Sequence, residues 1–520
     1  MADYIVLAWV AFIFLAAVFF SCASFIRLFQ NKKIGFNKGF LVILSACVVA
    51  FLLSLSIRPA FHRVYQDEFT YISQSANILS SGKASITFKG TLFHPEAFAP
   101  LVITAKFPGF SWLEAVTLFL TRDPGQSYFI LNLILAILSV AIVYRIIWSM
   151  TASVAVAWWS AIFWASLPAR ITYSMSASSD IAGSFFFLLF LLFLSEYRLL
   201  NSRRILYAAL FCGIYSVCIK PFYGVFVVLG LAVVLYIYRQ GGLIDKKAHK
   251  QIWIDAFCLF LPVMIALPSL GSKAGAWSFS FVSSNIYTSA SYLFDHKQNT
   301  VLTSLAALVA VGQSIFHKKD NLVNWFAGWF LLGFLMLSAF CAGGLSYPSQ
   351  AYSDRYFLFL AFPFVFLAAK GMVDIITRPR LSFLGPLFFI VLLVNAFSAS
   401  YGLTQEAREN FHFKKALLLK QVFHLVPDEA YILDECAAFL NTITVKRSIQ
   451  MDFFVNGDHP KEVVFLRGLS DGFYDSEDPQ GVMAVKKILN SEYGCKPLTV
   501  SPLKEAYLSV APYLCLRKQD

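Results

Sequence analysis

Repeated apolar runs constrain the fold of this chain more than any other feature of its sequence. Stretches of about 15–23 mostly apolar residues, the length that crosses a bilayer as a helix, recur up to about residue 400. With 58% hydrophobic and only 14% charged residues, the chain is typical of a polytopic membrane protein. The segments on either side of Lys220-Pro221 are consistent with one broken helix or with two short ones. We predict about 12 spans, at 4–26, 40–57, 127–149, 152–168, 182–197, 205–219, 222–238, 252–270, 300–316, 322–341, 356–369 and 382–398.

Basic residues occupy alternate loops between these spans, as they do in short cytoplasmic loops. They cluster at 27–38, 198–204, 239–250, 318–319 and 370–380. With these loops in the cytoplasm, we expect the amino terminus and the chain after residue 400 to lie outside. The first run is then a signal anchor or a plain first span. The net charge of +12 is mostly topological, so we expect membrane lipids and no nucleic acid as partners.

The last part of the chain, residues 401–520, carries charges throughout and has no run long enough to span a membrane. We expect a small extracytoplasmic α/β domain here, following a transmembrane domain over residues 1–400. Its patterns predict helices over 409–426 and 479–493 and strands over 430–435, 462–469 and 511–518. Two of its three cysteines, Cys436, Cys495 and Cys515, can pair in an oxidising compartment, and the connectivity stays open.

Two adjacent carboxylates, Asp67 and Glu68, lie at the start of the first large outer loop, which we place over residues 58–126. Tyr71 follows about one helical turn later, on the same face of a predicted helix. Charged residues are costly near hydrocarbon, and those that are kept there usually face a cavity, a partner or a substrate. The alternative is an acidic pair that only solvates an amphipathic surface helix.

Further charged residues gather on the same predicted side of the membrane: Lys106 in AKFPGFSWL, Asp180, Lys220, and Arg355, which Tyr356 follows. Glycosyl transfer from a phosphate-linked lipid uses such a set. A carboxylate takes the proton of an acceptor hydroxyl, and cations stabilise the leaving phosphate. The alternatives are a helix N-cap for Asp180 and interfacial anchors for Lys220 and Arg355.

The order of these motifs resembles the membrane glycosyltransferases of the GT-C fold, in particular the protein O-mannosyltransferases and the aminoarabinose (lipid A) transferases. Each of the family's motifs has a counterpart here: its Asp-Glu pair with a following Tyr, its Lys- or His-Pro-Pro-Leu turn, its Asp, its Lys segment and its Arg-Tyr pair. Two positions depart from the pattern: Gly109 replaces the second Pro, and Ala105 replaces the acidic residue that precedes Lys106 in aminoarabinose transferases.

The resemblance implies an all-α GT-C-like membrane protein with Asp67 as the catalytic base and Glu68 holding the acceptor or the base. A donor-phosphate and substrate-binding set follows from the same resemblance: Tyr71, Lys106, Asp180, Lys220, Arg355 and Tyr356. The implied donor is a monosaccharide linked to polyprenyl phosphate, and the acceptor is a lipid, a glycan or a protein. Some GT-C enzymes use a divalent metal, so a metal on the carboxylates stays an open alternative.

We therefore expect an inverting glycosyltransferase of the plasma (inner) membrane that acts in the cell envelope on the non-cytoplasmic face. The alternative is a transporter or flippase for a lipid or small solute, since a bundle with a broken helix also describes carriers. Hydropathy shows no two-fold repeat, and the charges gather at span ends rather than in mid-span, which favours the transferase. A third class is a non-enzymatic assembly or receptor protein with a binding tail.

Overall fold

The computed structural model of the chain describes all residues except 1, 31–35, 56–64, 93, 99–107, 123–126, 201, 241–245, 272–277, 280–300, 317–319, 342–353, 409–410, 435–439, 442–443, 445, 468–478, 500, 506–507 and 519–520. The chain forms two compact units. Unit 1 comprises Met1–Ala60, Ile103–Phe110 and Phe129–Thr404, and unit 2 comprises Phe61–Val102, Ser111–Tyr128 and Gln405–Asp520.

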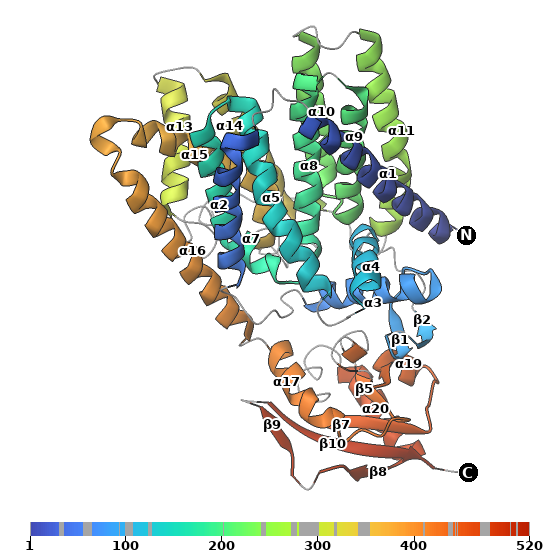
Figure 1. Ribbon diagram of the computed structural model, residues 1–520. Helices are drawn as coiled ribbons and strands as arrows, with labels where there is room; N and C mark the ends of the chain where they lie inside the picture. Colours follow the sequence, from blue (N-terminus) through green and yellow to red (C-terminus); the bar gives the residue numbers. More distant parts are fainter. Residues whose placement is uncertain are drawn as a thin grey trace. The chain divides into compact units, whose positions relative to one another are not determined.

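Unit 1 is built from apolar helices, and the predicted spans fall on them, with 152–168 shared by α6 and α7 (Figure 1). The end of the span predicted at 322–341 is instead a short strand, β4 (Phe340–Cys341), which pairs with β3 (Ser278–Phe279). In the described part of the chain, α5, Leu7–Ser24, Ser179–Tyr197 and Leu384–Gly402 are long and apolar enough to cross a membrane alone. The helices are α1 (Ala2–Gln30), α2 (Phe36–Leu55), α5 (Ser127–Thr151), α6 (Val154–Ser166), α7 (Pro168–Ser174), α8 (Ser179–Leu200), α9 (Arg203–Ile219), α10 (Tyr223–Gln240), α11 (Lys246–Gly271), α13 (Val301–Phe316), α14 (Asn321–Ala339), α15 (Asp354–Ile376) and α16 (Leu384–Arg408).

Two helix breaks in unit 1 occur at the residue before a proline. Lys220 is extended (φ −141°, ψ 110°), so α9 and α10 are two separate helices. Leu167 is also extended (φ −62°, ψ 121°), and here α6 and α7 form a fifth candidate span that is bent by 59°. Proline disfavours the helical conformation of the preceding residue and lacks an N–H, which accounts for both breaks.

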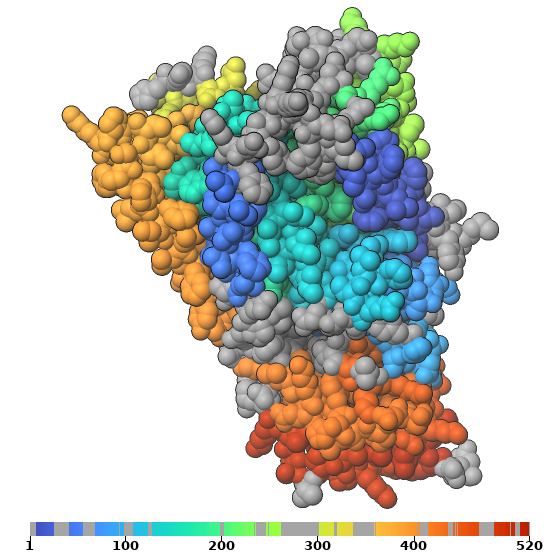
Figure 2. All heavy atoms as spheres, in the orientation of Figure 1, coloured from blue at the N-terminus to red at the C-terminus, as the bar shows by residue number. Residues whose placement is uncertain are grey.

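The helices of unit 1 differ in burial: α8 is enclosed by its neighbours, whereas α16 exposes an apolar face. The span Ser179–Tyr197 of α8 is 94% buried inside the unit, and a Cβ on its Gly183 would lie 2.8 Å from the Tyr223 ring. Small residues at such positions let helices approach closely. On α16, by contrast, Leu387, Val394 and Phe397 are exposed on one face, and α16 (orange) lies at the surface in Figure 2. This apolar face suits contact with lipid tails.

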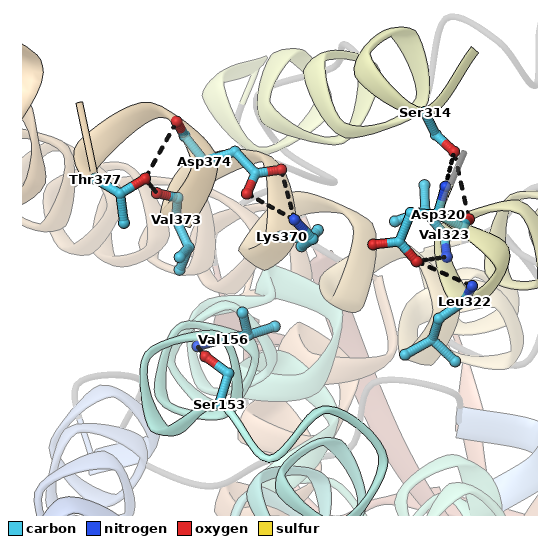
Figure 3. Close-up of polar contacts among 10 residues, drawn as sticks. All are labelled: Ser153, Val156, Ser314, Asp320, Leu322, Val323, Lys370, Val373, Asp374 and Thr377. Atoms are coloured by element: carbon cyan, nitrogen blue, oxygen red, sulfur yellow. Dashed lines mark hydrogen bonds and ion pairs between the residues drawn. The ribbon is translucent and has the colours of Figure 1, made fainter. Parts of the chain in front are cut away.

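Polar contacts satisfy groups near helix ends in unit 1 (Figure 3). The Asp320 carboxylate accepts hydrogen bonds from two backbone N–H groups of the first turn of α14, at 3.0 and 3.2 Å. The Ser153 hydroxyl accepts from a first-turn N–H of α6 at 3.3 Å. Near the end of α15, the Lys370 ammonium contacts both carboxylate oxygens of Asp374, at 2.6 and 2.8 Å. The first two contacts cap backbone donors that a helix leaves unpaired.

Unit 2 contains one mixed sheet in the order β2-β1-β6-β5-β7-β10-β8, with β9 on β10. β5 is parallel to β6 and β7, and the other pairs are antiparallel. The first-loop hairpin of β1 and β2 joins the strands of the tail through the β1–β6 pairing. The strands are β1 (Thr87–Gly90), β2 (Pro95–Phe98), β5 (Tyr431–Asp434), β6 (Ser448–Gln450), β7 (Glu462–Arg467), β8 (Tyr493–Pro497), β9 (Leu503–Glu505) and β10 (Leu508–Arg517).

Helices pack on the sheet of unit 2 and complete its core. They are α3 (Tyr65–Ser81), α17 (Phe411–Phe423), α19 (Met451–Val455) and α20 (Pro479–Glu492). A further helix, α4 (Gly109–Thr121), contacts α3 and belongs to unit 2 from Ser111 onward. Phe69 of α3 packs with Leu418 of α17 and Ile432 of β5, while Leu433 of β5 packs in a second cluster with Val485 of α20. Neighbouring residues of β5 thus point to opposite sides, and both sides are buried. The helices and strands predicted for the tail are confirmed as α17, α20, β5, β7 and β10.

The tail also contains a disulfide and a buried ion pair. Cys495 of β8 and Cys515 of β10 face each other across the strand pair and are bonded, which answers the open connectivity; Cys436 lies outside the described residues. Lys415 of α17 contacts the Asp434 carboxylate at 2.7 Å, with side-chain exposures of only 1% and 3%. Both links tie secondary-structure elements of unit 2 together.

Candidate active site

The acid motif occupies the first turn of α3. Asp67 and Glu68 are the third and fourth residues of this helix, where carboxylates interact favourably with the helix N-terminus. Glu68 is fully buried and Tyr71, on the next turn, is 4% exposed. The side chain of Asp67 lies outside the described part of the structure. A merely solvated surface pair is therefore wrong for Glu68.

Buried polar side chains continue along α3 and fix it to the β1 hairpin. The Ser73 hydroxyl accepts a hydrogen bond from the Thr87 N–H at 2.9 Å. The Asn77 amide donates to the Ser85 carbonyl at 2.6 Å and to the Thr87 hydroxyl at 3.1 Å. These contacts satisfy groups that would otherwise be buried without partners. They hold the helix that carries the acid motif against the sheet of unit 2.

A second set of hydrogen bonds joins α3 to α4. It includes a buried acid, Glu114, to which the sequence alone had given no role. Ser111 donates to the Gln74 side chain at 2.8 Å, and the Ser75 hydroxyl lies 2.9 Å from Oε2 of Glu114. Glu114 is 0% exposed. Its burial raises the pKa of its carboxyl well above the usual range; the Ser75 contact opposes this shift and the charge of Glu68 adds to it. The sequence signal was present: Glu114 is the one charged residue of GFSWLEAVTLFLT.

Asp180 and Lys220, two predicted site residues far apart in sequence, are paired in unit 1. Asp180 lies in the first turn of α8, and the Lys220 ammonium, directly after α9, contacts its Oδ1. Their side chains are only 2% and 12% exposed. Asp180 is thus a buried counter-ion rather than a simple N-cap. Its second oxygen, Oδ2, has no hydrogen-bond partner among the described residues.

The other predicted site residues are only partly described. Lys106 lies outside the described residues. Arg355 and Tyr356 are the second and third residues of α15, and the structure does not describe their side chains. The structure therefore brings Glu68 and Tyr71 onto one helix of unit 2, and it pairs Asp180 with Lys220 in unit 1. Among the described residues, no group of three or more His, Cys, Asp and Glu side chains forms a metal-ligand set.

The arrangement of helices in this chain is that of the GT-C membrane proteins. The structure of ArnT from Cupriavidus metallidurans bound to undecaprenyl phosphate matches with a TM-score of 0.56 and 11% identity, over 92% of this chain and 98% of that chain. At this identity the similarity concerns the fold, and it confirms the GT-C fold that the sequence resemblance predicted.

Two further solved structures match less well. The archaeal oligosaccharyltransferase AglB from Archaeoglobus fulgidus, in complex with an inhibitory peptide and a dolichol-phosphate, has a TM-score of 0.47 and 12% identity, over 89% of this chain and 70% of that chain. The apo state of Cupriavidus metallidurans ArnT has a TM-score of 0.41 and 12% identity, over 92% and 98%. No family model and no curated protein sequence matches the chain.

Proposed function

We propose that this protein is an integral membrane glycosyltransferase that moves a monosaccharide from a polyprenyl-phosphate-linked donor to an acceptor hydroxyl. The observation that carries the proposal is the buried acid motif: Glu68 is 0% exposed in the first turn of α3. A carboxylate is costly to bury, and buried acids are commonly kept for chemistry. The GT-C fold supports this, since a solved protein of that fold holds undecaprenyl phosphate.

In the proposed reaction, Asp67 is the general base that takes the proton of the acceptor hydroxyl. Asp67 directly precedes the buried Glu68 in the first turn of α3. In this scheme Glu68 holds either the acceptor or Asp67 in position. The attacking oxygen then forms a bond to the anomeric carbon while the bond to the phosphate oxygen breaks. A single displacement of this kind inverts the anomeric centre.

We assign stabilisation of the leaving polyprenyl phosphate to Lys220, with Lys106 and Arg355. Fixed cations are worth more in a poorly solvated site than in water, because the surroundings screen them less. The contact with Asp180 fixes the Lys220 ammonium in position before the donor arrives. Asp180 is in this scheme a positioning residue and Lys220 the phosphate contact.

Two observations support a site on the non-cytoplasmic face of the plasma membrane. Basic residues cluster in alternate loops, which puts the acid-motif loop and the tail outside. The disulfide between Cys495 and Cys515 suits an oxidising compartment, where such bonds persist. The proposed acceptor is accordingly a component of the cell envelope: a lipid, a glycan or a protein.

The test is sugar transfer by purified, full-length protein supplied with polyprenyl-phosphate sugars and an envelope extract as acceptor. Release of polyprenyl phosphate is followed by mass spectrometry. We expect Asp67→Asn to lower the rate at least about 100-fold, since general-base catalysis contributes about 10²–10⁴. Asp374→Asn is the matched control, because Asp374 contacts Lys370 near the far end of α15. Full activity of Asp67→Asn at equal expression would remove Asp67 as the base.

A carrier is the second candidate function, and one feature of unit 1 favours it. The bent pair of α6 and α7 contains Arg170, which is fully buried and donates to the backbone carbonyls of Ala165 and Ala50 at 3.0 and 3.4 Å. Broken helices and buried ionisable groups are features of transporters. Movement of lipid-linked sugar across vesicle membranes without release of polyprenyl phosphate would favour this candidate.

A further inference from the structure

The hydroxyl of Ser75 lies between two oxygens, and it has only one proton to donate. Its Oγ is 2.6 Å from the carbonyl oxygen of Tyr71 and 2.9 Å from Oε2 of Glu114. A carbonyl oxygen can only accept, so the shorter contact requires the Ser75 proton. Two oxygens at 2.9 Å without a hydrogen between them repel each other. A protonated Glu114 that donates to Ser75 satisfies both contacts, whereas a charged Glu114 would have to share the one Ser75 proton with the Tyr71 carbonyl.

The surroundings of Glu114 agree with this proton count. Its side chain is fully buried, and Oε1 has no hydrogen-bond partner among the described residues. The charged residues of α3 and α4 are all acids: Asp67 and Glu68 on α3, and Glu114 itself on α4. Burial raises the pKa of Glu114, and the Glu68 charge adds to this shift. A hydrogen bond donated by Ser75 would oppose the shift, but the shorter contact assigns the Ser75 proton to the Tyr71 carbonyl. α4 has 13 residues and is too short to cross a core of about 30 Å.

We propose that Glu114 is held as a neutral carboxylic acid and acts as a positioning residue for the acid motif of α3. Its proton bonds Ser75, and Ser75 bonds the carbonyl of Tyr71, one turn beyond Glu68. Glu68, Tyr71 and Ser75 are spaced by three and four residues, so they follow one face of α3. The chain of hydrogen bonds fixes how far α3 is rotated against α4, and hence where the motif points.

A neutral Glu114 also avoids a second buried negative charge beside Glu68. Two carboxyls that act on each other in a poorly solvated site do not ionise together readily. The positioning role rests on the proposed transferase function, whereas the protonation of Glu114 does not. The experiment therefore reads the two separately.

The test compares Glu114→Gln with Glu114→Ala in purified full-length protein. A Gln amide donates to Ser75 as the neutral acid does, so we expect transfer within about twofold of wild type at pH 6 and an unchanged donor KM. The Ala variant lacks the hydrogen-bond donor to Ser75, so the rotation of α3 against α4 is no longer fixed. We therefore expect kcat to fall about tenfold or more. Ser111→Ala is the matched control: it removes the neighbouring α3–α4 hydrogen bond, which involves no titrating group.

The independent readout is thermal stability against pH, together with the infrared C=O band of a protonated carboxyl. The pKa of Glu114 is raised in the folded protein, so the neutral carboxyl favours folding relative to the charged one. This contribution to the free energy of unfolding is complete below the pKa of Glu114 in the unfolded chain, and it is lost as the pH rises through the pKa in the folded protein. Wild type and Ser111→Ala should show this loss, and Glu114→Gln should show neither the loss nor the infrared band.

Equal pH dependence and equal infrared bands in wild type and Glu114→Gln would overturn the neutral acid. If instead Glu114→Gln lost transfer as fully as Glu114→Ala while it stayed folded, a charged Glu114 would be needed and the positioning role would be wrong. Absence of transfer in wild type itself would count against the proposed function, and the melting and infrared comparison would still decide the state of Glu114.

Discussion

Asp180 and Lys220 depend on each other because both are largely buried. Asp180→Asn removes the carboxylate that the largely buried Lys220 ammonium contacts, so we expect the free energy of unfolding to fall by about 3–5 kcal/mol. The double variant Asp180→Asn with Lys220→Met should recover most of that loss, because neither charge remains. Thermal unfolding of the purified variants measures both effects. If the double variant were no more stable than Asp180→Asn alone, the loss would not come from the broken contact between Asp180 and Lys220.

The same double variant separates folding from donor binding. If Lys220 holds the leaving phosphate, a protein that melts normally should still lose kcat or show a raised KM for the donor. Lys220→Arg, which keeps the charge but not the compact ammonium, should retain part of the activity. Transfer at the wild-type rate in the folded double variant would remove Lys220 from the donor site.

The sequence indicated some residues of the proposed site and gave no role to Glu114, for a physical reason. Asp67, Glu68 and Tyr71 could be found because they are close in sequence and follow helical spacing. Glu114 could not be assigned a role, because its partner Ser75 lies 39 residues away and only the folded α3–α4 contact joins them. Asp180 and Lys220 were both singled out, yet their pairing across 40 residues follows from the packing of α8 against α9.

The contact between α13 and α15 depends on a glycine. A Cβ at Gly371 of α15 would lie 1.8 Å from the Ala306 carbonyl oxygen of α13 and 3.1 Å from the Ala310 nitrogen. Gly371→Ala must therefore push the helices apart, and we expect a loss of about 1–3 kcal/mol in the free energy of unfolding.

Gly312 of α13 is the matched control for Gly371, because a Cβ there would meet no described atom within 4 Å. Gly312→Ala should leave stability unchanged or raise it by up to about 1 kcal/mol, the difference in helix propensity. Thermal unfolding of the two variants side by side measures the difference. Equal melting temperatures would contradict the close α13–α15 approach.

Helix ends could be anticipated where local chemistry decides them. Lys220-Pro221 indicated a break, and the same rule accounts for Leu167-Pro168, which the sequence analysis included in a single span at 152–168. A proline alone decides neither whether a helix breaks, since α15 continues through Pro363, nor whether the chain then reverses or only bends. That choice depends on the neighbouring helices, since α9 and α10 pack against each other, whereas α6 continues into α7 at 59°.

The compartment of the tail can be tested through the disulfide between Cys495 and Cys515. In a variant that keeps only these two cysteines, we expect no reaction with a membrane-permeant maleimide in intact cells until a reductant is added. Replacing both by serine should lower the stability of unit 2 by about 3 kcal/mol, the estimate for a loop of this length. Thiols that react without reductant would contradict an oxidising compartment, and with it the predicted topology.

The membrane part of the fold was predictable because the bilayer fixes the length of an apolar helix, so each run of sufficient length carries its own signal. The sheet of unit 2 was not predictable to the same extent. β5, β7 and β10 were expected from their apolar patterns, but the pairing of β1 with β6 joins strands from opposite ends of the chain. No local pattern near Thr87–Gly90 specifies that partner.

This pairing has a consequence for how the protein is made. The Lys89 ammonium contacts the Asp458 carboxylate at 2.8 Å across 369 residues of sequence, and Phe69 of α3 needs Leu418 and Ile432 to complete its core. During synthesis the acid-motif segment leaves the ribosome well before its packing partners are translated. The segment must stay without its native core until those residues have emerged, so a chain that still lacks them cannot assemble the folded acid motif.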